Sequence, residues 1–449
     1  MIEDNIERLR QDISAALEDG DNDLVSEILD SINVAEISSL LDSMPSQQRD
    51  LLWPKIEPAC LGAVLLETGD EVRDNFLKEL SPGEITSIIE TLPDVDDQAD
   101  IILSLSTEKL VNILPTLDAQ KREKLESVLS YSDDTAGGLM NIDQITIRAD
   151  VTLDVVLRYL RIRGEMPDHT DQLFVTDRHD HYLGALYLRD LLTNDLEVLV
   201  KNIMRTDVSA MHAHIPDTEV AREFENYDLV SAPIVDEQHK LIGRITIDDV
   251  VDVIRDEGEH SIMSMAGLAD EDDIFSPALI SAKRRGLWLG VNLLTAFLAA
   301  GVIGFFEDIL EQVVALAILI TIVPSMGGIA GSQTLTLAIR GLALGQLGSS
   351  NYKSLIKKEI TIGILNGLIW ALVVATFSIV WFENFNIGAI IGFALVVNLI
   401  AGAFAGAVIP ILLRQIGIDP AIAGGVLLTT VTDVVGIIAF LGLATLVLS

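Results

Sequence analysis

The sequence predicts a multidomain membrane protein with an α-helical superhelical N-terminal domain, a duplicated α/β module, a connecting helix and a five-helix α transmembrane domain. Three observations predict this fold class. Apolar residues recur at helical spacing in the first third of the chain, one longer pattern then occurs twice, and long apolar runs fill the residues from 281 onward. Such periodicity, internal repeats and apolar runs of about 20 residues are typical of these structures.

Residues 1–136 are expected to form the acidic helical domain. Apolar residues recur every three or four positions in the segments 24–32, 85–92 and 109–117. A helix-start signature stands at Ser81-Pro82-Gly83-Glu84. The spacing of these blocks predicts stacked helical hairpins that form a small superhelix.

The charge of the chain lies almost entirely in this first part and the module that follows. The net charge is −37, and 22 of the 30 basic and 60 of the 67 acidic residues precede residue 281. Such a surface repels nucleic acid and anionic lipid, so nucleic acid is excluded as a partner. Divalent cations are its natural counter-ions. The single cysteine, Cys60, excludes an intramolecular disulfide.

The duplicated pattern is an opening strand, a helix, two short strands and a closing helix. LFVTD and YLGALYLRDLL in the first copy match APIVD and LIGRITIDDVV in the second, which pairs Asp177 with Asp236 and Asp190 with Asp249. The duplication resembles a tandem pair of CBS domains, which are regulatory modules and not enzymes. We assign the α/β tandem CBS domains to residues 137–200 and 201–258. An acidic connecting helix, 248–275, overlaps the end of the second repeat.

The transmembrane domain is assigned to residues 281–449. Uncharged runs cover 286–306, 312–339, 360–382, 384–413 and 420–432, the last resuming after Asp433. Each is long enough to cross the ~30 Å hydrocarbon core. The basic residues that flank the runs all fall on one side. The positive-inside rule therefore predicts a multi-pass protein of the cell's inner membrane with a cytosolic N-terminus and an extracytosolic C-terminus.

Asp433 is the candidate residue of the ion pathway. It lies 13 residues after Pro420 and 16 before Ser449, about 20 Å or slightly more of helix on either side, which is near the middle of the bilayer. A lone carboxylate there costs at least about 2.5–3.5 kcal/mol. Thr429 and Thr430 share its helix face. No uncharged run contains a basic partner, which favours a cation; the alternative is a hydrogen bond to a neighbouring helix for packing.

The ligand types indicate which cation. Carboxylate, hydroxyl and carbonyl oxygens suit Mg²⁺, Ca²⁺ or Mn²⁺, and the absence of Cys and His from the runs disfavours Zn²⁺ and Cu⁺. A wide, wet site suits Mg²⁺, which keeps several waters. A homodimer that places two copies of Asp433 across an axis would supply the charge.

Other membrane features have structural interpretations. The segment Pro324-Ser325-Met326-Gly327-Gly328-Ile329-Ala330-Gly331-Ser332-Gln333 predicts a helix break or very close packing. The pairs Gly363/Gly367 and Gly402/Gly406 are interpreted as packing motifs, Asn398 as an interhelical hydrogen bond and Asp419 as the N-cap of the fifth helix.

Two acidic clusters in the cytosolic part are candidate regulatory sites. Most acidic runs are solvated faces, but two on neighbouring domains repel unless cations bridge them, and bridging would make domain closure depend on the ion. The candidates are Asp94, Asp96, Asp97 and Asp100, then Asp248, Asp249, Asp252, Asp256, Glu257 and Glu259. Thr246 and Asp249 also match the ribose-contacting pattern of nucleotide-binding CBS repeats, so ATP is a further candidate ligand; the first repeat has Tyr187 in place of the hydroxyl residue.

The domain order, together with PSMGGIAGSQ, Asp419-Pro420-Ala421 and Thr429-Thr430-Val431-Thr432-Asp433, resembles the MgtE family of Mg²⁺ channels over essentially the whole chain. The resemblance implies a homodimer with the pore on its axis and Asp433 at the ion site. It also implies a connecting "plug" helix that closes the pore when cytosolic Mg²⁺ is high. This chain departs from the family at Gly424-Gly425-Val426, at Gly137-Gly138-Leu139-Met140, and at His260, where another acid is expected.

The expected function is a Mg²⁺-selective channel in the lipid bilayer that takes up Mg²⁺ and is closed by Mg²⁺ binding between the acidic cytosolic domains. The alternative is an ion-coupled divalent-cation carrier in which Asp433 binds a proton or cation. An intramembrane aspartyl protease needs two carboxylates that share a proton, and the runs contain one Asp. A receptor with a purely anchoring membrane part would not need a carboxylate at the midplane.

Overall fold

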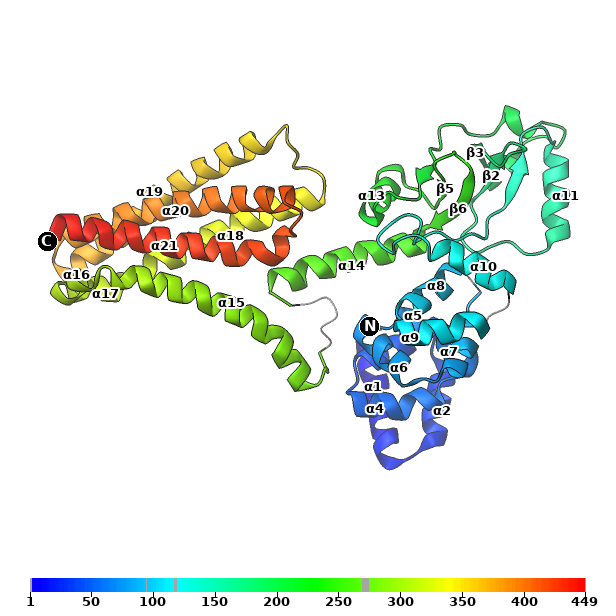
Figure 1. The fold of residues 1–449 in the computed structure, drawn as a ribbon, viewed down its shortest axis with the longest axis horizontal. Helices are drawn as coiled ribbons and strands as arrows, with labels where there is room; N and C mark the ends of the chain where they lie inside the picture. The colour runs from blue at the N-terminus through cyan, green and yellow to red at the C-terminus, as the bar shows by residue number, and fades with distance from the viewer. Residues whose placement is uncertain (1, 94, 117–118, 269–273, 449) are drawn as a thin grey trace. The chain divides into compact units, whose positions relative to one another are not determined.

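The computed structural model describes residues 2–93, 95–116, 119–268 and 274–448 (Figure 1). The chain forms two compact units. The cytosolic unit contains residues 1–259 and 271–276, and the membrane unit contains residues 260–270 and 277–449.

The N-terminal part of the cytosolic unit is built of short helices, as predicted. Capping boxes begin two of them, at Asn33 with Glu36 and at Ser81 with Glu84, where Pro82 takes the first helical position. The helices are α1 (Ile2–Asp19), α2 (Asn22–Ser31), α3 (Val34–Asp42), α4 (Ser46–Leu52), α5 (Leu61–Glu67), α6 (Asp70–Glu79), α7 (Pro82–Ile89), α8 (Val95–Leu103), α9 (Thr107–Ile113) and α10 (Ala119–Val128), with 3₁₀ turns at Trp53–Lys55, Pro58–Cys60 and Leu114–Thr116.

The α/β part contains the predicted duplication. Each repeat has a three-stranded sheet in which the first two strands are parallel and the last two antiparallel. The first repeat has β1 (Thr146–Arg148), α11 (Leu153–Arg163), β2 (Gln172–Thr176), β3 (Tyr182–Tyr187) and α12 (Leu188–Thr193), followed by a 3₁₀ turn at Val200–Asn202. The second has β4 (Met211–His212), α13 (Asp217–Tyr227), β5 (Ser231–Val235), β6 (Leu241–Thr246) and α14 (Ile247–Met265). Strands β2 and β5 are buried throughout because both faces are covered.

The helical part and the second repeat share one hydrophobic core. The same cluster contains Ile89 and Ile102 of the helices, Met140 of the junction, and Phe224 and Val250 of the second repeat. Backbone hydrogen bonds from the junction, such as Gly137 N–H to the Ala213 carbonyl (2.8 Å), continue this connection. Burial of this core keeps α8 and α14 in one packed unit.

Helix α14 is shorter than the connecting helix predicted for 248–275, because it ends at Met265. Gly267 has φ +72°, and the N–H of Leu268 bonds back to the Met263 carbonyl. A glycine in the left-handed region followed by such a bond terminates a helix. Residues 269–273 of the predicted helix lie outside the described residues.

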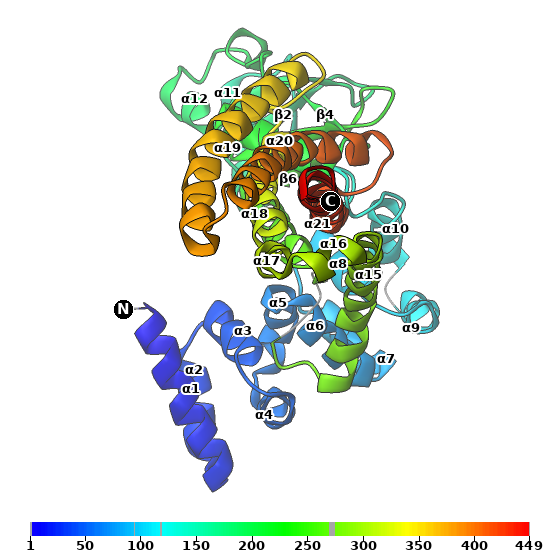
Figure 2. The same cartoon turned by 90° about the vertical axis from the view of Figure 1, so that its left-hand side faces the viewer.

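The membrane unit contains five helices that are long and apolar enough to span a membrane, as predicted. The spans are α15 (Ala278–Gly304), α17 with α18 (Val314–Leu319 and Ile322–Ala343), α19 (Tyr352–Phe382), α20 (Phe385–Gln415) and α21 (Pro420–Leu448), and the short helix α16 (Glu307–Gln312) follows the first. Helix α20 packs against α18, α19 and α21, whereas α15 packs on α21, on the side away from α19 (Figures 1 and 2).

Of the two interpretations of the Pro- and Gly-containing segment, very close packing is confirmed, because residues 324–333 lie within the continuous helix α18 and the helix break lies just before it. The second span is interrupted at Ile320–Thr321, where α17 gives way to α18. Beyond the break, α18 and α20 pack with their backbones in contact. A Cβ on Gly402 would lie 2.5 Å from the Gly327 carbonyl oxygen, and one on Gly406 would overlap the Gly331 carbonyl oxygen. The glycines therefore permit a helix approach that a larger residue would prevent.

Replacing Gly406 with Ala should destabilise the membrane unit, because the added Cβ must push α18 and α20 apart. We expect a cost of about 1–3 kcal/mol, typical of overpacking, and a lower midpoint in thermal unfolding of the detergent-solubilised protein followed by tryptophan fluorescence. Gly290→Ala is the matched control, because open space surrounds that position on α15. Equal midpoints for the two variants would contradict the packing argument.

Candidate cation sites

Asp433 lies on α21 between Thr432, which contacts α18, and Gly436, which contacts α20. The side chain of Asp433 is half-buried, and within the described part of the chain it has no hydrogen bond or ion pair. Next to it, the Thr432 hydroxyl lies 3.7 Å from the Cβ position of Gly328 on α18. A half-buried carboxylate without a protein partner needs water or a cation to complete its coordination.

The two threonines predicted to join Asp433 keep their oxygens available. The Thr429 hydroxyl donates to the Gly425 carbonyl (2.9 Å) and the Thr430 hydroxyl to the Val426 carbonyl (2.8 Å). A hydroxyl that donates to its own helix retains its lone pairs as acceptors. Thr429 is exposed and Thr430 half-buried. One turn of α21 thus presents a carboxylate and two hydroxyl oxygens, all hard donors.

Asn398 fixes the helices around this turn. It is fully buried on α20 and donates a hydrogen bond of 2.7 Å from Nδ2 to the Val323 carbonyl of α18, which confirms the predicted interhelical bond. Its amide also lies against Gly327 and Gly436, the latter one turn after Asp433. Its Oδ1 has no hydrogen-bond partner among the described residues. Asn398 therefore joins α18 and α20 beside the candidate ion site.

A second carboxylate lies on a membrane helix and was not among the predicted site residues. Glu359 directly precedes the uncharged run that begins at residue 360, but α19 begins at Tyr352, so Glu359 lies inside the helix and is only 3% exposed. Its carboxylate accepts a hydrogen bond of 3.0 Å from Thr334 of α18. The sequence marks Glu359 only by its position between the basic pair 357–358 and an apolar run. That position does not reveal that Thr334 of α18 lies opposite the Glu359 carboxylate.

Asp419 has the predicted capping role and one more. Its Oδ1 accepts the Ala421 N–H at 2.9 Å at the start of α21. Its Oδ2 lies 2.8 Å from Nε2 of His260, near the end of α14. His260, which stands where another acid is expected, therefore contacts the start of α21 directly, and both residues belong to the membrane unit.

In the cytosolic unit, α8 and α14 bring acidic side chains together. Burial and the nearby Asp97 raise the pKa of Asp100 to about 7, and Asp252 contributes to the increase. Burial and Asp248 raise the pKa of Asp249 to about 7, with a smaller contribution from Asp97. Carboxylates from both predicted clusters therefore lie within electrostatic range of each other.

The same face contains carboxylates that the sequence analysis did not select. Burial raises the pKa of Asp252, and Glu67, the last residue of α5, adds to the effect. Asp133 contributes in the same way to Asp100. Glu67 ends an apolar helix and Asp133 stands beside Asp134 in a turn sequence, so no local pattern linked either residue to the two predicted clusters. Their place in the cluster comes from the packing of separate helices.

Three of the other predicted regulatory residues are exposed on α14, and two are not fully described. Asp94 lies outside the described residues, and of Asp96 only its place on α8 is described. Arg255 pairs with Asp252 of the acidic face at 3.0 Å and with the exposed Asp256 at 3.3 Å. Glu257 and Glu259 are also exposed there.

The candidate nucleotide residues are adjacent to each other. The single proton of the Thr246 hydroxyl is within hydrogen-bond reach of Asp249 Oδ2 (3.2 Å) and of Asp248. Thr246 is buried, and its hydroxyl is held at the junction between β6 and α14. Asp249 thus belongs to both the candidate nucleotide position and the acidic face.

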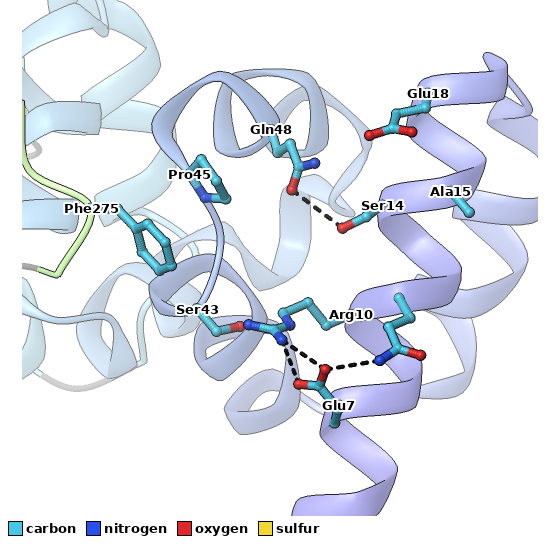
Figure 3. A pocket seen from close by; sticks show the side chains of 10 residues that line it. Glu7, Arg10, Ser14, Ala15, Glu18, Ser43, Pro45, Gln48 and Phe275 are labelled. Carbon is cyan, nitrogen blue, oxygen red and sulfur yellow. Dashed lines mark hydrogen bonds and ion pairs between the residues drawn. The ribbon is translucent and has the colours of Figure 1, made fainter.

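A surface depression between α1 and α4 does not resemble a ligand site. Three of its polar side chains donate to neighbours within it: Arg10 and Gln11 donate to Glu7, and Ser14 donates to Gln48 (Figure 3). Phe275 closes one side. Because these three donors already bond to neighbouring side chains, they are not free to form a donor set for a ligand.

Comparison with known proteins supports the membrane assignment. A family model described as "MgtE: Divalent cation transporter" matches residues 320–443, the "MgtE intracellular N domain" matches 32–134 and the "CBS domain" matches 200–256. The magnesium transporter MgtE of Thermus thermophilus is 30% identical over 449 residues, which cover 98% of this chain and 99% of its relative. That of Bacillus subtilis is 28% identical, covering 93% of this chain and 92% of its relative.

The crystal structure of the cytosolic domain of the Mg²⁺ channel MgtE in complex with ATP is 30% identical, covers 54% of this chain and 99% of that chain, and has a TM-score of 0.49. With an apolar five-helix part, a helical N domain and a CBS pair joined in the same order along almost the full length of its relatives, the chain belongs to the MgtE family of magnesium transporters.

Proposed function

We propose that this protein is a Mg²⁺-selective channel for uptake and that Asp433 holds the permeating ion. The observation that carries the proposal is the half-buried Asp433 carboxylate, which has no protein partner within the described residues and shares its helix face with two hydroxyl oxygens. Mg²⁺ retains several waters and is held by one or two carboxylates. A homodimer with Asp433 of each chain across the axis would provide that charge to a hydrated ion.

We further propose that cytosolic Mg²⁺ closes this path by binding the acidic face between α8 and α14. The raised pKa values of Asp100 and Asp249 reflect carboxylates whose ionisation is opposed first by burial and then by neighbouring acids. A divalent cation between them would replace repulsion with attraction. Closure is then linked to Mg²⁺ because the ion binds the closed arrangement better than the open one.

An ion-coupled carrier remains the second candidate, in which Asp433 alternately binds a proton and a divalent cation. The absence of a protein partner for this carboxylate within the described residues is compatible with it. The two mechanisms differ in driving force: a channel passes Mg²⁺ down its electrochemical gradient, whereas a carrier needs a second ion gradient.

Further parts of the proposal concern placement and ligands. The N-terminus is cytosolic and the C-terminus extracytosolic in the inner membrane, as the basic flanks favour. ATP would bind beside Thr246 and Asp249, where a hydroxyl and a carboxylate are adjacent.

Replacing Asp433 with Ala or Asn should lower Mg²⁺ uptake by more than about ten-fold, since about 1.4 kcal/mol of lost ion stabilisation already corresponds to that factor. Uptake into proteoliposomes with a Mg²⁺-sensitive dye measures the effect. Asp308→Asn is the control, because it removes a carboxylate from the short helix α16 outside the uncharged runs. Normal uptake in a correctly assembled Asp433→Ala variant would contradict the pore assignment.

Millimolar Mg²⁺ should protect the cytosolic unit against limited proteolysis, because bridging ions hold α8 and α14 together. Asp100→Asn/Asp249→Asn should be protected without Mg²⁺, since the amides remove the repulsion. The control Asp23→Asn/Asp30→Asn changes the same number of charges on α2 and should behave like the wild type. Equal Mg²⁺ dependence in all three proteins would exclude bridging at this face.

Without Mg²⁺, the same protection should decrease as pH rises through about 7. The closed face raises the pKa of Asp100 and Asp249 from 3.8 to about 7, so the closed arrangement binds more protons than the open one between these values. The contact is therefore favoured below this range and weakened above it. Mg²⁺ should consequently protect more at pH 8 than at pH 6, and a pH-independent Mg²⁺ effect would contradict this assignment.

A further inference from the structure

The turn between β2 and β3 in the first CBS repeat groups two imidazoles and a carboxylate. His181 Nδ1 lies 2.9 Å from Asp177 Oδ2, and His179 projects from the same turn. One ligand atom from each of these three side chains lies within 4.8 Å of the others. His179 is exposed, and His181 and Asp177 are partly exposed, so solvent and ions can reach the group.

The corresponding turn of the second repeat has the same backbone without this group. Asp236 accepts the N–H groups of Gln238 (2.9 Å) and Lys240 (2.8 Å), as Asp177 accepts those of His179 (2.7 Å) and His181 (3.0 Å). The fourth residue of each turn is left-handed, with φ +64° at position 180 and +62° at position 239. The turn therefore does not require imidazoles, because Gln238 and Lys240 occupy the equivalent positions.

We propose that Asp177, His179 and His181 bind a divalent transition-metal ion of the Zn²⁺ class. Imidazole nitrogen and carboxylate oxygen are ligands of Zn²⁺, and three protein ligands leave a position for water. The nitrogen–oxygen donor set separates this site from the carboxylate and hydroxyl sites, which suit Mg²⁺.

The geometry requires a small closure. Ligands about 2.0–2.1 Å from a tetrahedral Zn²⁺ are about 3.3 Å apart, so the exposed His179 side chain must rotate toward the other two. Asp177 accepts the two backbone N–H groups through Oδ1, and its Oδ2 lies beside His181 Nδ1. It either binds the ion directly or orients His181 so that Nε2 does.

The surrounding charges leave the group accessible. Arg148 pairs with Asp180 at 3.2 Å, and Arg178 lies 4.0 Å from Asp150. The neighbouring turn contributes Lys240, whose backbone bridges that of His181. Lys240 is exposed, so its ammonium group can extend into water.

The test is Zn²⁺ binding to the purified full-length protein in detergent, with millimolar Mg²⁺ present to occupy the carboxylate sites. A competing chromogenic chelator reports the affinity. The variant His179→Gln/His181→Lys introduces the residues that the second repeat uses in the same turn, so the fold is retained. The matched control His212→Gln/His214→Lys makes the same changes at two exposed histidines with the same spacing.

Wild type and control should bind one Zn²⁺ per chain at least about ten-fold more tightly than the variant. Co²⁺ should give visible absorption bands of a low-coordinate imidazole site in wild type and control, and the variant should lack them. Unchanged Zn²⁺ affinity in the variant, or no Zn²⁺ binding by the wild type in the presence of Mg²⁺, would overturn the proposal. Mg²⁺ flux is expected to be unaffected, so failure here is separate from failure of the proposed function.

Discussion

The carboxylate of Asp433 lies within an apolar helix, where it requires water or a cation. The uncharged runs offer no basic residue, and the described residues provide neither a hydrogen bond nor an ion pair. Such a group persists only in a wet cavity or beside a cation. Asn398, the paired glycines of α18 and α20, and the self-bonded threonines of α21 can all be understood as the framework that holds this turn open.

The cytosolic unit presents the same physical problem outside the membrane. Carboxylates from α5, α8 and α14 approach one another because a shared hydrophobic core packs these helices together. The apolar core therefore favours an arrangement that the charges oppose. In the proposed mechanism, a hard divalent cation or protonation resolves the opposition in favour of closure, so the ion that passes Asp433 also closes its own path.

Local sequence patterns predicted the elements well and their contacts only in part. The capping box at Ser81, the duplicated strands and the five apolar runs follow from short-range rules, and the structure contains each of them. The end of α14 at Met265 depends on the single glycine at 267, which the acidic pattern obscured. Glu359 with Thr334, and Glu67 with Asp252, come from different helices, so no pattern along the chain could pair them.

The most direct test is Mg²⁺ flux into liposomes that contain the oriented protein, driven by a membrane potential without a proton or sodium gradient. The account predicts flux that follows the voltage and falls steeply when Mg²⁺ is added on the side of the cytosolic unit. Flux that requires a second ion gradient, or that is indifferent to Mg²⁺ on that side, would contradict it.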